Sequence, residues 1–303
     1  MQRAAVIVNP SKIKRPRELR NQLTAVFHAH GWADPLWWET TVESPGTEQA
    51  VAAVAEGVDL VAALGGDGTV RYVAAGLLAS RTPLAVLASG TGNLLARQLK
   101  LPVGHFAAGL EAALNGTQRP IDVMRVARDV DGDGDFGPDD ISLVMGGIGL
   151  DADIMDTTDD RLKSRVGWLA YPLVGLRHFM HDLITARLQF DNDTHLERDV
   201  SSVLVGNCGL LAGGVKLMPD AVVDDGLLNA VVLRGGGLRW APVITKVIVR
   251  SKRGSQALER HGVRELTVSV DRSCLVEVDG DVLGPARTVR FSVDPGALVV
   301  CCP

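Results

Sequence analysis

The chain has 303 residues, a length typical of two ordinary domains or of one large domain. Apolar residues make up 46% and charged residues 22%, which excludes a disordered chain and indicates a globular protein with a substantial core. The net charge of -5 excludes the basic surface that nucleic-acid binding needs, so we expect no nucleic-acid partner. Four cysteines without metal-ligand spacing and the lack of a membrane-length apolar run predict a cytoplasmic protein with no transmembrane segment.

The first 125 residues alternate short apolar runs with helical spacing. This alternation predicts a parallel sheet with helices on both faces, and ligands of such sheets bind at the carboxyl ends of the strands. The expected strands are 4–8, 36–39, 58–64 and 84–88, and the expected helices are 16–30, 47–56, 70–79 and 94–99.

After Pro120 the pattern changes to short runs that alternate apolar with polar residues and are separated by turn residues. Such runs predict a mostly antiparallel β domain. The expected strands are 121–128, 141–145, 186–190, 199–205, 227–233, 263–270, 275–278 and 288–293, and two helices are expected at 161–183 and 237–250.

Two glycine-rich turns each follow a buried strand of the first domain and precede a helix. They are Gly65-Gly66-Asp67-Gly68-Thr69 and Ser89-Gly90-Thr91-Gly92-Asn93, and the first strand ends in Asn9 at the same expected edge. Such turns let the backbone approach a phosphate with its N–H groups, so they predict a nucleotide cradle that includes Asn9, Gly90 and Asn93. The alternative is a tight strand–helix turn with Asp67 as N-cap.

Two further segments leave alternatives open. The run from Asp129 to Asp140 matches a calcium-loop pattern, but its flanks are expected strands, so an acidic hairpin loop is favoured over a calcium site. The apolar helix expected at 161–183 suits packing on the β domain, or an apolar wall for a lipid tail.

Five short motifs occur in order along almost the whole chain. They are Gly65-Gly66-Asp67-Gly68-Thr69, Gly90-Thr91-Gly92-Asn93, Gly147-x-Gly149-x-Asp151-Ala152, Pro219-x-Ala221-x-x-x-Asp225-Gly226-Leu227 and Asp279-Gly280-Asp281. This ordered set resembles the diacylglycerol kinase catalytic family, specifically the soluble bacterial lipid kinases related to sphingosine kinases. The first motif alone is less specific, because NAD kinases and phosphofructokinases have similar loops.

The resemblance implies an ATP-dependent lipid kinase that uses Mg²⁺ and phosphorylates a hydroxyl of diacylglycerol or a similar lipid. The implied fold is an NAD kinase-like α/β nucleotide-binding domain over 1–125 and a C-terminal antiparallel β-sandwich over 126–293. The tail, about 294–303, would pack back onto the first domain, and the site would lie between the domains. The protein would bind its lipid substrate at the inner membrane face. Whether it forms a homodimer is left open.

The resemblance also implies roles for individual residues. Thr91 and a threonine before the second helix contact ATP; Thr41 matches the latter best, with Thr40 as the alternative. Nucleotide phosphates are assigned to the loop residues Gly65, Gly66, Asp67, Gly68, Thr69, Val70 and Arg71.

A structural Mg²⁺ and a general base are implied in the second domain. Asp225 would hold the Mg²⁺ together with the carbonyls of Val222 and Leu227; without the family context this segment is an acidic hairpin turn. Asp281 would take the proton of the acceptor hydroxyl, with Asp279 as the alternative base.

The chain departs from the family pattern at three positions. Asp281 replaces the usual Glu, Leu94 stands where an acid is common, and Arg71 stands where Asn is common. The changes at 281 and 94 keep open a nucleotide-binding regulatory protein without catalysis. A second alternative is an NAD kinase-like small-molecule kinase, which would share the fold but should show an Asn-Glu pair for ribose contact downstream of the first loop, and none is seen there.

Overall fold

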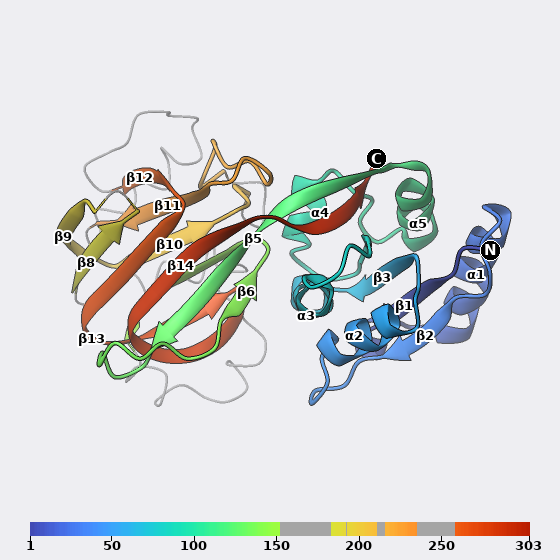
Figure 1. The fold of residues 1–303 in the computed structure, drawn as a ribbon, viewed down its shortest axis with the longest axis horizontal. Coiled ribbons are helices and arrows are strands. Elements are labelled where there is room, and N and C mark those ends of the chain that lie inside the picture. The colour runs from blue at the N-terminus through green and yellow to red at the C-terminus, as the bar shows by residue number, and fades with distance from the viewer. Residues whose placement is uncertain (152–182, 192, 211–215, 235–257) are drawn as a thin grey trace. The chain divides into compact units, whose positions relative to one another are not determined.

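The computed structural model describes residues 1–151, 183–191, 193–210, 216–234 and 258–303. The chain forms two compact units (Figure 1). Unit 1 comprises Met1–Ile121 with Gly296–Pro303, and unit 2 comprises Asp122–Pro295. The helix expected at 237–250 lies outside the described residues, as does the helix expected at 161–183 apart from the exposed Leu183.

Unit 1 is an α/β domain built on a parallel sheet with the strand order β4-β3-β1-β2. The last residues of β14 add a parallel strand beside β4 through Val300 and Leu84. Every residue of β1, β3 and β4 is buried, which explains their continuous apolar sequences. The strands are β1 (Ala4–Val8), β2 (Leu36–Glu39), β3 (Leu60–Gly65), β4 (Leu84–Ala88) and the end of β14 (Asp281–Cys302).

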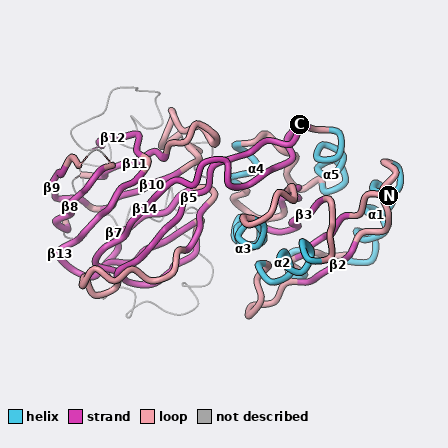
Figure 2. Tube along the Cα trace, in the orientation of Figure 1, coloured by secondary structure: helices cyan, strands magenta, loops and turns pink. Residues whose placement is uncertain are grey.

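Helices surround this sheet and close its core (Figure 2). Leu23 and Phe27 of α1 and Leu110 of α5 are fully buried against the strands. Helix α5 is absent from the elements that the sequence predicts. The helices are η1 (Pro10–Lys12), α1 (Pro16–Ala29), α2 (Thr47–Ala55), α3 (Asp67–Leu77), α4 (Leu94–Gln98) and α5 (Phe106–Asn115).

Unit 2 is an antiparallel β-sandwich. One run of paired strands has the order β12-β11-β10-β7-β13-β14. β8 pairs with the first half of β13, and β9 pairs with β8. A large core cluster of apolar side chains fills much of the unit, with Phe291 fully buried, and a smaller cluster forms around Leu204, Met218 and Val231. The strands are β5 (Thr117–Asp129), β6 (Asp140–Ser142), β7 (Met145–Asp151), β8 (Ile184–Phe190), β9 (His195–Val200), β10 (Ser202–Gly206), β11 (Leu228–Leu233), β12 (Leu258–Val263), β13 (Glu265–Val278) and β14 (Asp281–Cys302).

Several predicted strands of this unit have wrong bounds. The strand expected at 141–145 is divided into β6 and β7, because Leu143 and Val144 turn their N–H groups toward a carboxylate. The strand expected at 199–205 is divided at Ser201 into β9 and β10. The strands expected at 263–270 and 275–278 are one strand, β13, because a register shift absorbs the polar residues between them.

Candidate active site

The carboxyl ends of β1, β3 and β4 lie at one edge of the sheet in unit 1, as parallel pairing requires. The Asn9 N–H donates to the Leu64 carbonyl at 2.9 Å, and the Ser89 N–H donates to the Gly65 carbonyl at 2.8 Å. The Asn9 amide also donates to the Thr69 hydroxyl at 3.3 Å. The two glycine-rich loops and the end of the first strand are therefore brought together.

The two glycine-rich loops touch each other through their backbones. A Cβ placed on Gly90 would lie 2.7 Å from the Cα of Gly66, and one placed on Gly66 would lie 3.3 Å from the Cα of Gly90. A side chain at Gly90 would therefore force the loops apart. The glycines at these positions are required by the close approach of the loops.

Asp67 joins the loops. It is the first residue of α3, whose N-cap is Gly66, so its carboxylate does not cap its own helix. Its Oδ1 instead accepts from the Leu94 N–H of the second loop at 2.8 Å. Its Oδ2 would lie 3.0 Å from a Cβ on Gly92, so that glycine leaves room for the carboxylate.

Asn93 closes the second loop on itself. It has a left-handed backbone with φ of 48°, and only 2% of it is exposed. Its Oδ1 accepts from the Gly90 N–H at 2.7 Å, and its Nδ2 donates to the Gly90 carbonyl at 2.5 Å. Thr91, between the two, is exposed. The geometry thus leaves Thr91, rather than the Asn93 side chain, facing solvent.

The structure also shows what surrounds Arg71 and the two threonine alternatives, Thr41 and Thr40. Arg71 is 2% exposed, and its guanidinium carbon lies 4.4 Å from the ring centroid of Tyr72. The Thr41 hydroxyl is exposed and accepts from the Ser44 N–H at 3.0 Å. Thr40 is buried, and its N–H donates to the Val8 carbonyl at 2.9 Å. Thr41 is therefore the more accessible of the two alternatives.

The segment predicted to hold a metal forms a turn before β11. Asp225 is exposed, and its Oδ1 accepts from the Leu227 N–H at 3.0 Å. The buried Asp122 accepts from the N–H of the preceding residue, Gly226, at 2.7 Å. Asn207, which is fully buried, donates to the carbonyls of Asp122 and Val223 at 2.7 and 3.4 Å. The turn is thus fixed from beneath by two buried polar side chains.

The two candidate bases differ in their surroundings. Asp279 is 7% exposed and has a left-handed backbone with φ of 50°. Its carboxylate accepts from the Ser142 hydroxyl at 2.7 Å and from three N–H groups, of Leu143, Val144 and Met145, at 2.9 to 3.1 Å. Asp281, two residues later, is exposed. Asp279 therefore anchors the β13–β14 turn to the β6–β7 turn, and Asp281 is the accessible carboxylate.

Sequence reasoning missed Glu277 as a candidate residue. It is 8% exposed on β13, and burial, followed by the charge of Asp281, raises its pKa to about 7. The available signal was a single acid within the apolar run Leu275-Val276-Glu277-Val278.

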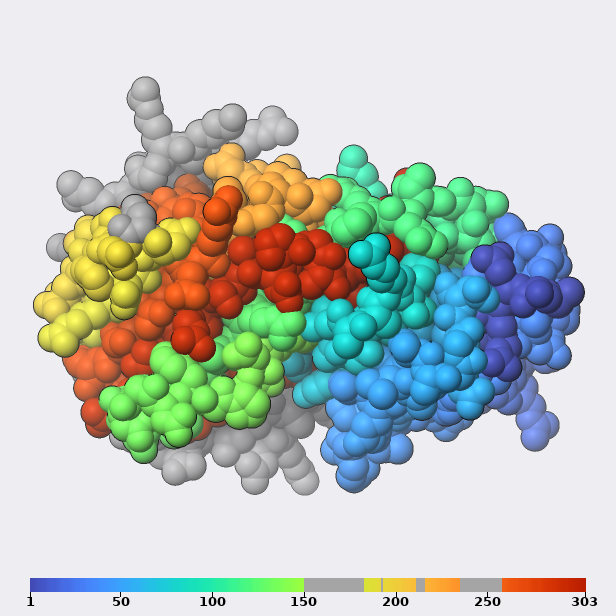
Figure 3. All heavy atoms as spheres, in the orientation of Figure 1, coloured from blue at the N-terminus to red at the C-terminus, as the bar shows by residue number. Residues whose placement is uncertain are grey.

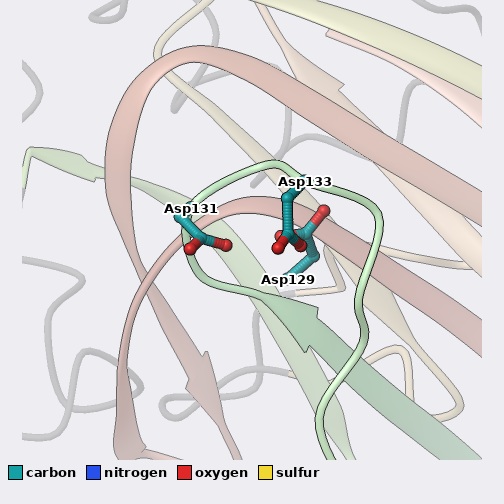
Figure 4. A group of neighbouring side chains, drawn as sticks. All are labelled: Asp129, Asp131 and Asp133. Carbon is teal, nitrogen blue, oxygen red and sulfur yellow. The ribbon is translucent and has the colours of Figure 1, made fainter.

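The acidic loop lies between β5 and β6, on the surface of unit 2 (Figure 3). Figure 4 shows Asp129, Asp131 and Asp133 around this loop, with one oxygen of each within 4.8 Å of the others. The buried Asp129 accepts from the Gly132 and Gly134 N–H groups at 2.7 and 3.0 Å, so its carboxylate shapes the loop. Calcium binding here, the less favoured of the two alternatives, stays untested.

Comparisons with known proteins identify the family. Residues 3–126 match the diacylglycerol kinase catalytic domain, and residues 144–302 match the YegS C-terminal NAD kinase beta sandwich-like domain. A Pseudomonas aeruginosa protein named probable lipid kinase YegS-like is 34% identical, covering 88% of this chain and 83% of its own. A Bacillus subtilis diacylglycerol kinase is 26% identical, covering 94% of this chain and 91% of its own.

Solved structures agree on the fold. A diacylglycerol kinase from Bacillus anthracis superimposes with a TM-score of 0.73 at 19% identity, covering 100% of this chain and 97% of that chain. An NAD kinase from Archaeoglobus fulgidus in complex with ATP superimposes with a TM-score of 0.52 at 13% identity, covering 99% and 93%. Both confirm the predicted NAD kinase-like α/β domain followed by a β-sandwich.

The chain therefore belongs to the diacylglycerol kinase catalytic family, and within it to the proteins with a YegS-type C-terminal domain. This confirms the predicted family and supports a lipid kinase. Across the described ranges, no helix is long and apolar enough to cross a membrane.

Proposed function

We propose that the protein transfers the γ-phosphate of ATP to the hydroxyl of diacylglycerol or of a similar lipid. The observation that carries this proposal is the contact of two glycine-rich loops, with Gly66 and Gly90 backbone to backbone and Asp67 bridging to Leu94. Backbone N–H groups and the start of α3 favour phosphate at such a place. Thr91 and Thr41, both exposed, are the proposed side-chain contacts to the nucleotide.

Asp281 is the proposed general base. Phosphoryl transfer needs a carboxylate that can reach the acceptor hydroxyl, and Asp281 is exposed whereas the oxygens of Asp279 accept four hydrogen bonds. The hydroxyl gives its proton to Asp281 while its oxygen bonds to the γ-phosphorus, and the bond to the ADP oxygen breaks.

Mg²⁺ is the proposed cofactor in two places. With ATP, it would neutralise charge that develops on the phosphate oxygens. In unit 2, Asp225 would hold a structural ion with the carbonyls of Val222 and Leu227. The donors at this turn are all oxygens, as Mg²⁺ prefers, and the Asp122 bond to Gly226 holds the turn in shape.

The test is transfer of labelled phosphate from ATP to a panel of diacylglycerol, monoacylglycerol, ceramide, sphingosine and phosphatidylglycerol in mixed micelles. We expect one labelled lipid product, strongest with diacylglycerol, and none after Asp281→Asn. Tight ATP binding with no labelled lipid would support the regulatory alternative. Phosphorylation of NAD instead would support the small-molecule kinase. Because the substrate is a lipid, contact with the inner membrane face is part of the proposal.

A further inference from the structure

The segment that follows β1 carries a concentrated positive charge to which the proposed function gives no role. Residues 12–20, the basic segment, contain five of the chain's 31 Lys and Arg residues and only one of its 36 acidic residues. The segment therefore has four positive charges in excess, in a chain whose net charge is -5. Its basic residues are Lys12, Lys14, Arg15, Arg17 and Arg20.

These charges face solvent and are largely unbalanced by acids of the protein. All five basic residues are exposed. The one acid of the segment, Glu18, pairs with Arg15 at 3.0 Å, and the two side chains are 69% and 76% exposed. Such a pair is weak because water screens it. Among the residues that the structure describes, Lys12, Lys14 and Arg17 form no ion pair. An external anion can therefore bind them without breaking a contact.

Helix α1 presents two of these cations on its outer surface. Its apolar residues Leu23 and Phe27 are buried against the sheet. Arg17 and Arg20 are three positions apart, so they are neighbours on the exposed surface of the helix. The Arg20 guanidinium carbon lies 4.9 Å from the ring centroid of Trp37, a half-buried residue of β2. A tryptophan beside cations at the surface is typical of protein segments that contact a membrane interface.

The basic segment begins at the edge of the sheet where the glycine-rich loops lie. The Asn9 amide donates to the Thr69 hydroxyl of the first loop at 3.3 Å. The Asn9 Oδ1 accepts from the N–H and the hydroxyl of Ser11 at 3.1 and 2.7 Å. Lys12 ends η1 three residues after Asn9, so their Cα atoms lie within about 11 Å of each other. The first cations of the segment are thus close to the proposed nucleotide edge of unit 1.

We propose that the basic segment docks the protein on an anionic phospholipid bilayer. The inference rests on the proposed function, because it concerns the surface from which the lipid substrate is taken. A bilayer offers many phosphate groups over a wide surface, and each Lys or Arg near it strengthens binding by about fivefold. The negative net charge of the whole chain disfavours nucleic acid as the partner.

Docking through exposed cations has two consequences. Binding to vesicles requires anionic lipid and weakens as the salt concentration rises, because salt screens exposed charges. Docking also concentrates the protein at the bilayer without changing the chemical step. The segment therefore affects the rate on a lipid embedded in anionic vesicles and leaves the rate on a water-soluble lipid unchanged.

The experiment measures sedimentation of the full chain with vesicles at about 0.1 M salt. One set of vesicles contains phosphatidylglycerol and phosphatidylcholine, and the other contains phosphatidylcholine alone. The first variant combines Lys12→Gln, Lys14→Gln, Arg17→Gln and Arg20→Gln. The matched control removes four exposed cations elsewhere and so has the same net charge; it combines Arg81→Gln, Lys216→Gln, Arg264→Gln and Arg287→Gln.

We expect wild type and the control to sediment with the anionic vesicles and not with the neutral ones. The variant of the basic segment should bind the anionic vesicles about 100-fold more weakly or worse, with a melting temperature close to that of the control. Equal binding by the two variants would overturn the inference, because overall charge and not this segment would then govern binding. Binding of wild type to neutral vesicles with the same affinity would also overturn it.

Two further measurements separate the bilayer from other anions. ATP binding without lipid should be the same in both variants. If the variant of the basic segment loses ATP binding and keeps vesicle binding, the segment serves the nucleotide and the inference is wrong. A DNA duplex that binds wild type more tightly than the anionic vesicles at the same salt concentration would likewise overturn the assignment to a bilayer.

Sedimentation needs neither ATP nor turnover, so it decides the inference even where the lipid panel shows no transfer and the proposed function fails. Where transfer occurs, the variant of the basic segment should phosphorylate diacylglycerol in dilute anionic vesicles about tenfold more slowly than the control or worse. Its rate on a water-soluble, short-chain diacylglycerol should equal that of the control. An equal loss on both substrates would place the segment in catalysis and overturn docking as its role.

Discussion

Asp67 illustrates how one carboxylate combines a structural bond with a negative charge. Its Oδ1 accepts from the Leu94 N–H, and an asparagine at this position can still accept that bond. Asp67→Asn should therefore keep the loops joined and melt close to wild type, while kcat falls about 100-fold or more, because the charge that acts on Mg-ATP is lost. Asp67→Ala should lose both the bond and the activity. If Asp67→Asn turned over at the wild-type rate, the negative charge of Asp67 would have no role in the mechanism.

Glu277 gives a stability prediction with a defined sign. Its pKa is about 7 in the folded protein against 4.5 as the ordinary value, so the folded state binds the proton more tightly. The stabilisation that comes from this tighter proton binding is complete below about pH 4.5 and is lost as the pH rises through about 7. Denaturant titrations should therefore show the free energy of unfolding of Glu277→Gln rising relative to that of wild type, by up to about 3 kcal/mol between about pH 4.5 and about pH 8. A constant difference across that range would contradict the raised pKa.

At the level of elements, the two glycine-rich loops depend on each other. A Cβ on Gly90 meets the Gly66 backbone at 2.7 Å, so Gly90→Ala should separate the loops and raise the KM for ATP about tenfold. Gly262→Ala is the control, because no atom lies within 4 Å of a Cβ built there. An unchanged KM in Gly90→Ala would show that the contact of the loops does not shape the nucleotide site.

The turn that contains Asp225 should respond to Mg²⁺. If Asp225 holds an ion, Mg²⁺ without nucleotide should raise the melting temperature of wild type and not that of Asp225→Ala. The neighbouring Asp224, also an exposed acid, provides the control, and Asp224→Ala should keep the wild-type response. Equal responses to Mg²⁺ in wild type and Asp225→Ala would leave Asp225 as a turn residue.

Most elements of unit 1 were predictable, because β1, β3 and β4 are continuous buried apolar runs bounded by turn residues. The strands at 4–8, 36–39 and 84–88 have the predicted bounds. In unit 2 the bounds were wrong where long-range contacts decide them. The Asp279 carboxylate ends β6 by binding the Leu143 and Val144 N–H groups, and those residues are 136 and 135 positions away in sequence. No local pattern encodes such a contact.

Across the whole molecule, the family and fold followed from five short motifs, and the structure explains why the details of the site did not. The motifs gave Asp281 as the base, with Asp279 as the alternative. The burial of Asp279 and the exposure of Asp281 distinguish them, and both depend on the packing of strands distant in sequence. The buried state of Glu277 depends on the same packing, so a sequence pattern alone shows only an acid in an apolar run.

The assignment of Asp281 as the base is tested by kcat for lipid phosphorylation by Asp281→Asn and Asp279→Asn, with the KM for ATP and the melting temperature of each. Asp281→Asn should lower kcat about 100-fold or more, with KM and melting near wild type, because only a proton acceptor is lost. Asp279→Asn should melt lower, because its new amide would face the Leu143 N–H that the carboxylate now accepts. A fully active Asp281→Asn would contradict the assignment of Asp281 as the base.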